Sequence, residues 1–395
     1  MKHHPTDPSS YLGQATERGI MIPIYTWDMG IRALHIDGRP PLRGVVAIQG
    51  SPNDAIQHIA MCARVASKGF IKSFPMVAQT AWALRTFREH GGYVRVEPDM
   101  VTLDSAQLNA DAPIRLDQES NCCSVETISA MSQRFGELRL AVSSPLLRTT
   151  SLISALQLLG HEVDMSGPCI IVRASRGMEK SLGQVCWPSN SPIVCGPDII
   201  DAVNWATLSA VTDGELALTN VPVQEIDSLL EVVPVLNYSV TDAGLVFRLT
   251  ESYADYKRPV IIDSRRIRSD ILIALAPAIA ATPIDITIES ITEKTRGHLF
   301  AVLKALGVHV QEMTPTRVRV PSADGGLRPF SQPLIMALEQ PQTSFPMLTR
   351  ALLTERTSTL CNLAVLSSSV ADLPERLTRL GAHIVSEPFV EAFEL

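Results

Sequence analysis

Five segments of the chain share one pattern of hydrophobic and polar positions, in which a helical period ends and a strand period begins. The clearest copy is ALQLLGHEVDM, at residues 155–165. Further copies occupy residues 86–96, 302–312 and 376–386, and a weaker copy without the glycine occupies residues 230–240. Glycine adopts the left-handed conformation that ends a helix, and the period then changes from 3.6 to 2 residues. We therefore predict five helix–strand junctions, roughly 70 to 75 residues apart, as expected of a repeated α/β unit.

The residues around these junctions predict repeated β-α-β-α-β-β units. The first unit, residues 44–104, contains predicted strands at 45–49, 70–74, 93–96 and 101–103 and predicted helices at 55–67 and 77–90. The same succession is predicted over residues 113–174, 182–249, 260–320 and 329–395. The polar and aromatic segment Tyr253–Pro259 is the predicted domain boundary.

Composition narrows the class of protein. The length of 395 residues, with 46% hydrophobic and 19% charged residues, predicts two domains with large cores. A net charge of −7 without a basic run argues against a nucleic-acid partner. The chain has no long uncharged apolar run and no signal-peptide pattern at its start, so we expect no membrane partner. Seven cysteines without CxxC spacing fit a reducing, cytoplasmic compartment, and we expect neither a metal nor a cofactor.

Four segments carry a resemblance to a known family: RGVVAIQGSPN at residues 43–53, GHLFAVLKALG at 297–307, Ser344-Phe345-Pro346, and DLPERLTRLGAH at 372–383. In these segments the chain resembles the enolpyruvyl transferase family. The resemblance implies an α/β protein with a two-domain, inverted α/β barrel-like fold built from repeated βαβαββ units around an interdomain cleft. Residues 44–255 would form a first domain of three units. Residues 1–43 and 256–395 would form a second domain, apparently reduced to two recognisable units. Because the family has six units, residues 1–43 could instead supply part of a sixth.

The resemblance also implies a chemistry, and the chain departs from it. The family adds a hydroxyl group to phosphoenolpyruvate, which requires fixed cations and an acid/base carboxylate. The lysine of the opening turn is replaced by Pro52. An arginine of the second unit is replaced by Glu126 or, in a shifted register, by one of the cysteines of Cys122-Cys123. A third cation position falls on Leu147 or Arg148. Loss of two cations would remove several kcal/mol of charge-assisted binding, so phosphoenolpyruvate is not the expected substrate.

The remaining polar groups define a candidate site. The predicted catalytic residues are Asp270, Glu126 and Arg148. The predicted substrate-binding residues are Ser51, Asn53, Asp54, Glu119, Arg268, Lys294, Arg296 and His298. Each has a structural alternative: helix capping for residues 53, 54 and 270, and a favourable helix dipole for the carboxylates 119 and 126. The basic residues could equally lie on solvated loops or charged turns.

Three functions remain open at this point. The leading hypothesis is an enzyme of specialised biosynthesis that performs acid/base chemistry on a small polar metabolite without phosphoenolpyruvate. Elimination, isomerisation and cyclisation would each suit such a site. The second hypothesis is an enolpyruvyl (carboxyvinyl) transferase with a rebuilt anion site. The third is an inactive binding or partner subunit, with oligomeric contacts through the apolar segment at residues 19–27.

Overall fold

The chain consists of two compact units. The computed structural model describes residues 32–38, 41–65, 68–97, 100–116, 125–142, 149–165, 169–174, 191–212, 214–249, 260–322, 327, 330–367 and 370–388. Among these, unit 1 lies within residues 56–74 and 81–194, and unit 2 lies within residues 29–55, 75–80 and 195–395. In the described part of the chain, no helix has the length and apolar character needed to cross a membrane.

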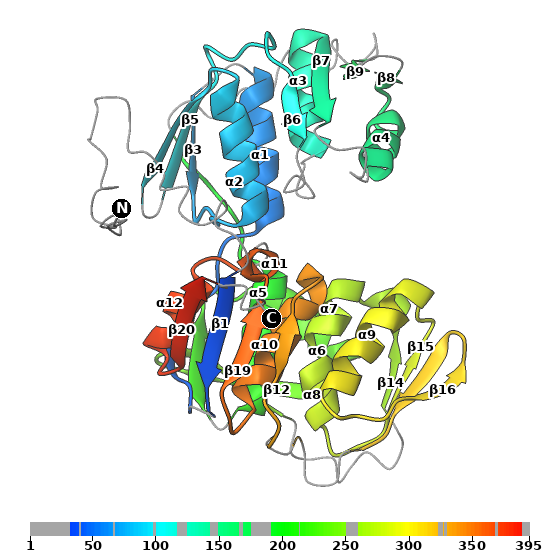
Figure 1. Cartoon of the computed structure of the whole chain (residues 1–395). Coiled ribbons are helices and arrows are strands. Elements are labelled where there is room, and N and C mark those ends of the chain that lie inside the picture. Colours follow the sequence, from blue (N-terminus) through cyan, green and yellow to red (C-terminus); the bar gives the residue numbers. More distant parts are fainter. Residues whose placement is uncertain are drawn as a thin grey trace, which may run out of the picture. The chain divides into compact units, whose positions relative to one another are not determined.

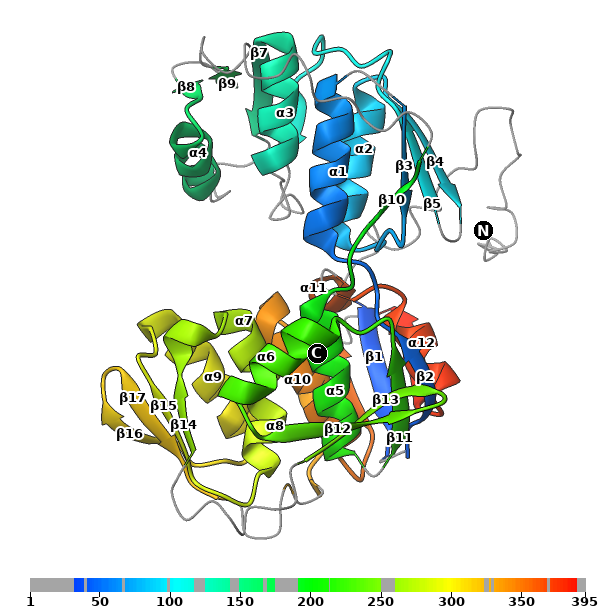
Figure 2. The same ribbon diagram turned by 180° about the vertical axis from the view of Figure 1, so that it is seen from behind.

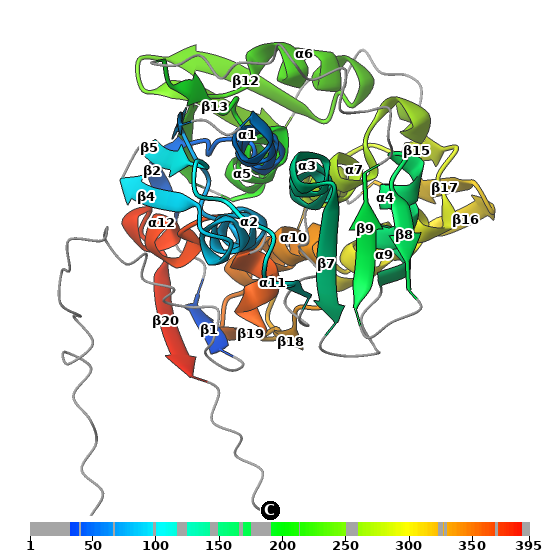
Figure 3. The ribbon, with the colours of Figure 1, turned by 90° about the horizontal axis from the view of Figure 1, so that it is seen from above.

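The described residues of unit 1 form two four-stranded sheets. The first has the strand order β10 (Ile193–Val194), β3 (Lys68–Lys72), β5 (Met100–Asp104), β4 (Tyr93–Glu97). Helices α1 (Pro52–Val65) and α2 (Ala78–Glu89) lie together on one side of it (Figure 1). The second has the order β6 (Ile114–Leu116), β7 (Glu137–Val142), β9 (Ile170–Arg173), β8 (Glu162–Asp164). Helices α3 (Val125–Phe135) and α4 (Thr149–Leu158) pack beside this sheet (Figure 3).

The described residues of unit 2 form three four-stranded sheets. Their orders are β12 (Leu236–Thr241), β13 (Gly244–Leu249), β11 (Glu215–Thr219), β2 (Arg43–Ala47); β14 (Val260–Asp263), β15 (Ile286–Glu289), β17 (Arg317–Val320), β16 (Gln311–Thr314); and β18 (Ile335–Ala337), β19 (Ser358–Cys361), β1 (Arg32–Asp37), β20 (His383–Pro388). The helices are α5 (Ile199–Val211), α6 (Val223–Val232), α7 (Ser269–Ala274), α8 (Ala276–Ala281), α9 (Glu293–Ala305), α10 (Pro341–Leu352), α11 (Leu363–Ser367) and α12 (Leu373–Arg379). Helices α5, α7, α8, α9 and α10 pack against one another (Figure 2), and their buried side chains, including Trp205, Leu272 and Phe345, form the core.

All five sheets have the same internal arrangement. In the second sheet of unit 1, β6 pairs parallel with β7, β7 pairs antiparallel with β9, and β9 pairs antiparallel with β8. Each of the other four sheets has one parallel pair followed by two antiparallel pairs in the same positions. The predicted βαβαββ repeat is therefore confirmed as the building block of the fold.

The helix–strand junctions lie where the hydrophobic pattern places them. Glycines 91, 160, 307 and 381 follow helices α2, α4, α9 and α12, with φ angles of 88°, 86°, 72° and 96°. These angles belong to the left-handed region that side chains with a Cβ rarely adopt. At the fifth junction the C-cap of α6, Val233, has φ −126°, so no glycine is required there.

Two strands are exchanged between repeats, which the sequence did not predict. Strand β2 directly precedes α1, yet it pairs in parallel with β11 of the third repeat. Strand β10, which directly precedes α5, pairs in parallel with β3 of the first repeat. The alternation of a strand's side chains specifies its buried face but not its partner, so local pattern assigned β2 to the wrong sheet.

The division into units also differs from the predicted one. The third repeat, predicted to lie with the first two, has its contacts in unit 2, because β2 and β11 share a sheet there. Unit 2 therefore has three sheets among the described residues, where two recognisable units were predicted. Strand β1 pairs with both β19 and β20 and completes the fifth sheet, so residues 32–37 contribute to the fifth repeat and not to a sixth.

Candidate functional site

Two chain segments cross at the start of helices α1 and α5, in unit 2. The Ser51 N–H donates to the Gly196 carbonyl at 2.6 Å, and the Gly196 N–H donates to Asp54 Oδ2 at 2.9 Å. The Asp198 N–H donates to the Gln49 carbonyl at 2.9 Å. These bonds follow directly from the exchange of β2 and β10, because each exchanged strand leads into the helix of the other repeat. The crossing brings together polar groups that are far apart in the sequence.

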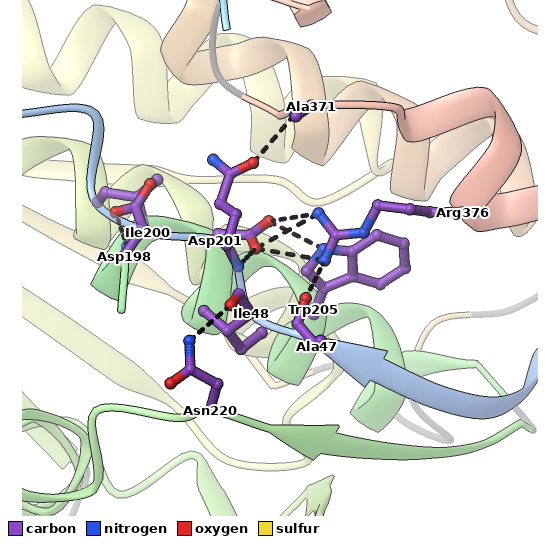
Figure 4. Close-up of polar contacts among 10 residues, drawn as sticks. Ala47, Ile48, Asp198, Ile200, Asp201, Trp205, Asn220, Ala371 and Arg376 are labelled. Carbon is purple, nitrogen blue, oxygen red and sulfur yellow. Dashed lines mark hydrogen bonds and ion pairs between the residues drawn. The ribbon is translucent and has the colours of Figure 1, made fainter. Parts of the chain in front are cut away.

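A buried carboxylate, Asp201, lies at the centre of this region (Figure 4). It accepts hydrogen bonds from the Gln49 N–H at 3.0 Å and from Trp205 Nε1 at 2.9 Å. The Arg376 guanidinium lies 3.3 to 3.4 Å from its oxygens, donates to the Ala47 carbonyl at 2.9 Å, and stacks over the Trp205 ring at 4.8 Å. Burial raises the pKa of Asp201, and the charge of Arg376 and the hydrogen bonds oppose that effect.

Asp198, one turn before Asp201, is a carboxylate with an unusual environment. It caps α5 by accepting from the Ile200 N–H at 3.0 Å. Burial first, and then the negative charge of Asp201, raise its pKa to about 6, against the hydrogen bonds from Ile200 and Gln49 and the charge of Arg268. Hydrogen bonding at a helix N-terminus lowers a carboxyl pKa, so capping alone does not explain this side chain. A carboxyl group that titrates near neutrality can both accept and donate a proton.

The predicted residues Arg268 and Asp270 lie beside each other at the start of α7. The Arg268 guanidinium donates to both oxygens of Asp270, at 3.2 and 2.7 Å. The hydrogen bond to Asp270 chiefly raises the pKa of Arg268, and the charge of Asp198 acts in the same direction. Asp270 lies inside the first turn of α7 and is not its N-cap, which is Arg268. The structure therefore brings Arg268 together with two carboxylates, Asp198 and Asp270.

The turn before α1 has no free cradle for an anion. Ser51 Oγ accepts from the Asp54 N–H at 3.3 Å and caps the helix, whereas Asn53 is exposed. The Ser51 N–H and the Asp54 carboxylate are both bonded to Gly196. The predicted residues of this turn therefore lie together, but they use their donors on one another and add a negative charge. Helix N-termini bind phosphate through free N–H groups and a positive dipole, and this turn offers little of either.

The other predicted residues lie on helix α9, in unit 1, or outside the described residues. Helix α9 carries Lys294, Arg296 and His298. Arg296 donates to the Pro315 carbonyl at 2.9 Å. Across the described ranges, no hydrogen bond or ion pair joins Arg296 to Asp270. Glu126 is exposed in the first turn of α3, in unit 1. Glu119 and Arg148 lie outside the described residues. No group of side chains within the described part of the chain could hold a metal ion.

The sequence analysis missed the four residues at the centre of the site. Asp198 and Asp201 form the pattern Pro-Asp-x-x-Asp before an apolar run, which is typical of an ordinary helix start. Gln49 and Arg376 lie on segments that no local pattern connects to Asp198 and Asp201. Only the strand exchange and the packing of α12 reveal that these side chains meet.

Three comparisons relate the chain to known proteins. No protein-family model matches it. A UDP-N-acetylglucosamine 1-carboxyvinyltransferase of Deinococcus deserti is 24% identical over 383 residues, 93% of this chain and 84% of that protein. The enolpyruvyl transferase NikO from Streptomyces tendae superimposes with a TM-score of 0.60 at 19% identity, over 91% of this chain and 99% of that one. An EPSP synthase from Acinetobacter baumannii gives a TM-score of 0.63 at 12% identity, over 90% and 100%. These likenesses show the fold.

Proposed function

Because the chain is a diverged relative of the enolpyruvyl transferase family and has its fold, we propose that it is an enzyme whose acid/base group is Asp198. Its substrate is a small polar metabolite of a biosynthetic pathway, and phosphoenolpyruvate is not required. The reaction is a proton transfer that leads to elimination, isomerisation or cyclisation. Asp198 exchanges the proton, while Arg268 and Asp270 bind and orient polar substrate groups beside it.

The environment of Asp198 is the observation that carries this proposal. A general acid or base is most effective when its pKa lies near the working pH, and the pKa of Asp198 is raised to about 6. Two opposite influences, the charge of Asp201 and the charge of Arg268, act on the same carboxyl group. Perturbed carboxyl groups of this kind concentrate at active sites.

The charges around the crossing segments support a substrate other than phosphoenolpyruvate. Arg376 is paired with Asp201, and Arg268 is paired with Asp270. Pro52 occupies the position of the cation in the opening turn, and Asp54 adds a carboxylate beside it. An anion carrying a phosphate and a carboxylate would need unpaired cations here. Glu126 and Arg148, the other predicted catalytic residues, remain predictions: Glu126 belongs to unit 1, and Arg148 lies outside the described residues.

A carboxyvinyl transferase with a rebuilt anion site is the second candidate. It is favoured by the carboxyvinyltransferase of Deinococcus deserti, whose similarity extends over 93% of this chain. In that case Arg148, Arg268 and Lys294 would supply the replacement cations. This function requires Arg268 to leave Asp270 when an anion binds, because the guanidinium is already occupied.

Incubation with a polar metabolite extract in D₂O, followed by mass spectrometry, distinguishes the candidates. Proton transfer by Asp198 predicts a metabolite that incorporates deuterium or loses water, in the absence of added phosphoenolpyruvate. Asp198→Asn, which retains the N-cap, should abolish the change, and Glu375→Gln at an exposed position of α12 should not. A metabolite that gains a carboxyvinyl group only when phosphoenolpyruvate is added would support the second candidate. No change under either condition would contradict both and leave a binding subunit.

A further inference from the structure

We propose that the buried pair formed by Asp201 and Arg376 positions Asp198. The pair holds Asp198 in place through Gln49 and through the charge of Asp201. The inference rests on the proposed function, in which Asp198 exchanges the proton. Neither Asp201 nor Arg376 contacts the substrate in this account. Both act through Asp198.

Gln49 is the mechanical connection between the two aspartates. Its N–H donates to Asp201 Oδ2 at 3.0 Å, and its carbonyl accepts from the Asp198 N–H at 2.9 Å. Its side chain bonds to the Asp198 carboxyl group, and its Oε1 accepts from the Ala371 N–H at 3.0 Å. The position of the Gln49 amide relative to Asp198 is therefore set by Asp201 on one side and by the segment before α12 on the other.

Arg376 anchors this arrangement from a part of the chain that is distant in sequence. Its guanidinium bonds to both Asp201 oxygens and to the Ala47 carbonyl, two residues before Gln49. It also stacks over Trp205, which donates to the same carboxylate (Figure 4). The Arg376 side chain is 13% exposed and the Asp201 side chain 0% exposed. Buried charge pairs with several further hydrogen bonds hold one geometry, because breaking any contact leaves an uncompensated charge.

The pair also sets the electrostatic field at Asp198. The charged groups that act on this carboxyl are Asp201 on its own helix and Arg268 before α7, whose guanidinium is bonded to Asp270. Arg376 compensates the charge of Asp201 and so limits the repulsion felt by Asp198. Removing the charge of Asp201 should favour ionisation of Asp198. Removing the charge of Arg376 should make the two aspartates together hold more protons, as expected of coupled carboxyl groups.

Titration of the aspartate carboxyl carbons by ¹³C NMR in the free protein tests the inference, with Asp198→Asn used to assign the resonance. In Asp201→Asn the Asp198 midpoint should fall by about one pH unit or more, a tenfold change in the ratio of its two forms. In Arg376→Gln, Asp198 and Asp201 together should bind more protons at pH 6 than in the wild type. Arg376→Lys, which keeps the charge, should be intermediate and provides a second variant if Arg376→Gln does not fold.

Arg379→Gln is the matched control, since Arg379 lies one turn further on α12 with a 72% exposed side chain. It should leave both titrations unchanged. Unaltered Asp198 midpoints in folded Asp201→Asn and Arg376→Lys would overturn the positioning role. The outcome is independent of the D₂O experiment, because the titration needs no substrate. If the variants change the Asp198 titration as expected but no Asp198-dependent reaction is found, only the proposed function would be contradicted.

Discussion

At the scale of single residues, Asp198 combines two roles that oppose each other energetically. It caps α5, which stabilises the helix, but its carboxylate is held where burial and Asp201 disfavour the charged form. Its folded-state pKa of about 6 lies above the ordinary value of 3.8. The native state therefore binds this proton more tightly than the unfolded chain, and the contribution to stability is lost as pH rises from about 4 to about 6.

We predict that Asp198→Asn is more stable than the wild type at pH 7.5 and gains little or nothing at pH 4. Asparagine retains the cap, so the difference isolates the cost of the partly buried charge. The shift corresponds to at most about 3 kcal/mol. Urea denaturation of both proteins at the two pH values measures it. A variant that is as stable as the wild type at both pH values would show that Asp198 serves only as a cap.

His161 in unit 1 should respond to pH in the opposite sense. It is 4% exposed, with Nε2 2.7 Å from Ser129 Oγ and Nδ1 3.3 Å from Ser132 Oγ. Burial lowers its pKa, so the folded state prefers the neutral ring. Stability is therefore present above the unfolded value of about 6.5 and is lost as pH falls below it, by about 1.4 kcal/mol per unit of pKa difference.

We predict that His161→Gln removes this acid sensitivity. Hydrogen exchange of α3 and β8 at pH 7.5 and pH 5 measures it, with exposed His383→Gln in unit 2 as the control. If His161→Gln loses protection at acid pH as strongly as the wild type does, the account of the buried imidazole is wrong.

Residue roles were only partly predictable from the sequence. The pattern placed Ser51, Asp54, Arg268 and Asp270 at helix starts, where the structure has them, because caps and helix starts are local features. It could not identify Asp198 as unusual, because desolvation and a neighbouring charge depend on packing that a local pattern does not encode.

At the scale of elements, glycine positions control the junctions between helix and strand. Gly91 has φ 88°, and a Cβ there would lie 2.5 Å from the Gln107 carbonyl oxygen. Gly297 lies inside α9, and a Cβ there would meet nothing within 4 Å. Gly91 therefore has a backbone conformation that favours glycine, whereas at Gly297 only helix propensity distinguishes glycine from alanine.

Gly91→Ala should destabilise the protein by more than about 1 kcal/mol, because alanine is strained at this φ and the carbonyl blocks its methyl group. Gly297→Ala should stabilise it by up to about 1 kcal/mol, because alanine is the better helix former. Denaturant midpoints of the two variants and the wild type measure both effects. Equal effects of the two substitutions would show that Gly91 is not required at its junction.

The elements were the most predictable level of structure. Helices α1 and α2 and strands β4 and β5 begin and end close to their predicted bounds, because their periods are encoded locally. Residues 269–281 form two short helices, α7 and α8, because Pro277 has no N–H to continue the hydrogen bonding of a single helix. The partners of β2 and β10 could not be predicted, since the same alternation fits either sheet.

At the scale of the whole molecule, the ends of the described chain belong to one sheet. Strand β1 lies between β19 and β20, and Leu34 is paired with Leu360, both fully buried. The sequence analysis left the role of residues 1–43 open, because a single short strand carries no information about a partner more than three hundred residues away. The fifth repeat is therefore complete only when both parts of the chain are present.

We predict that Leu34→Ala and Leu360→Ala each cost about 2 to 5 kcal/mol of unfolding free energy. Because they pack in one sheet, the double variant should deviate from additivity by about 0.5 to 3 kcal/mol. The control pairs Leu34→Ala with Leu84→Ala on α2 in unit 1, which should be additive. Additivity of the first pair as well would contradict the role of β1 in closing the sheet.

The proposed function implies that an acid/base carboxylate, Asp198, has replaced a phosphoenolpyruvate cradle on this fold. Calorimetric titration with phosphoenolpyruvate, shikimate 3-phosphate and UDP-N-acetylglucosamine, each alone and then in pairs, tests it most directly. We expect no binding of phosphoenolpyruvate, alone or with a second ligand. Proline stands at position 52, where the family resemblance implies a cation, Asp54 adds a carboxylate, and Arg268 and Arg376 are paired. Binding of phosphoenolpyruvate, above all if a second ligand strengthens it, would contradict the claim and identify a carboxyvinyl transferase.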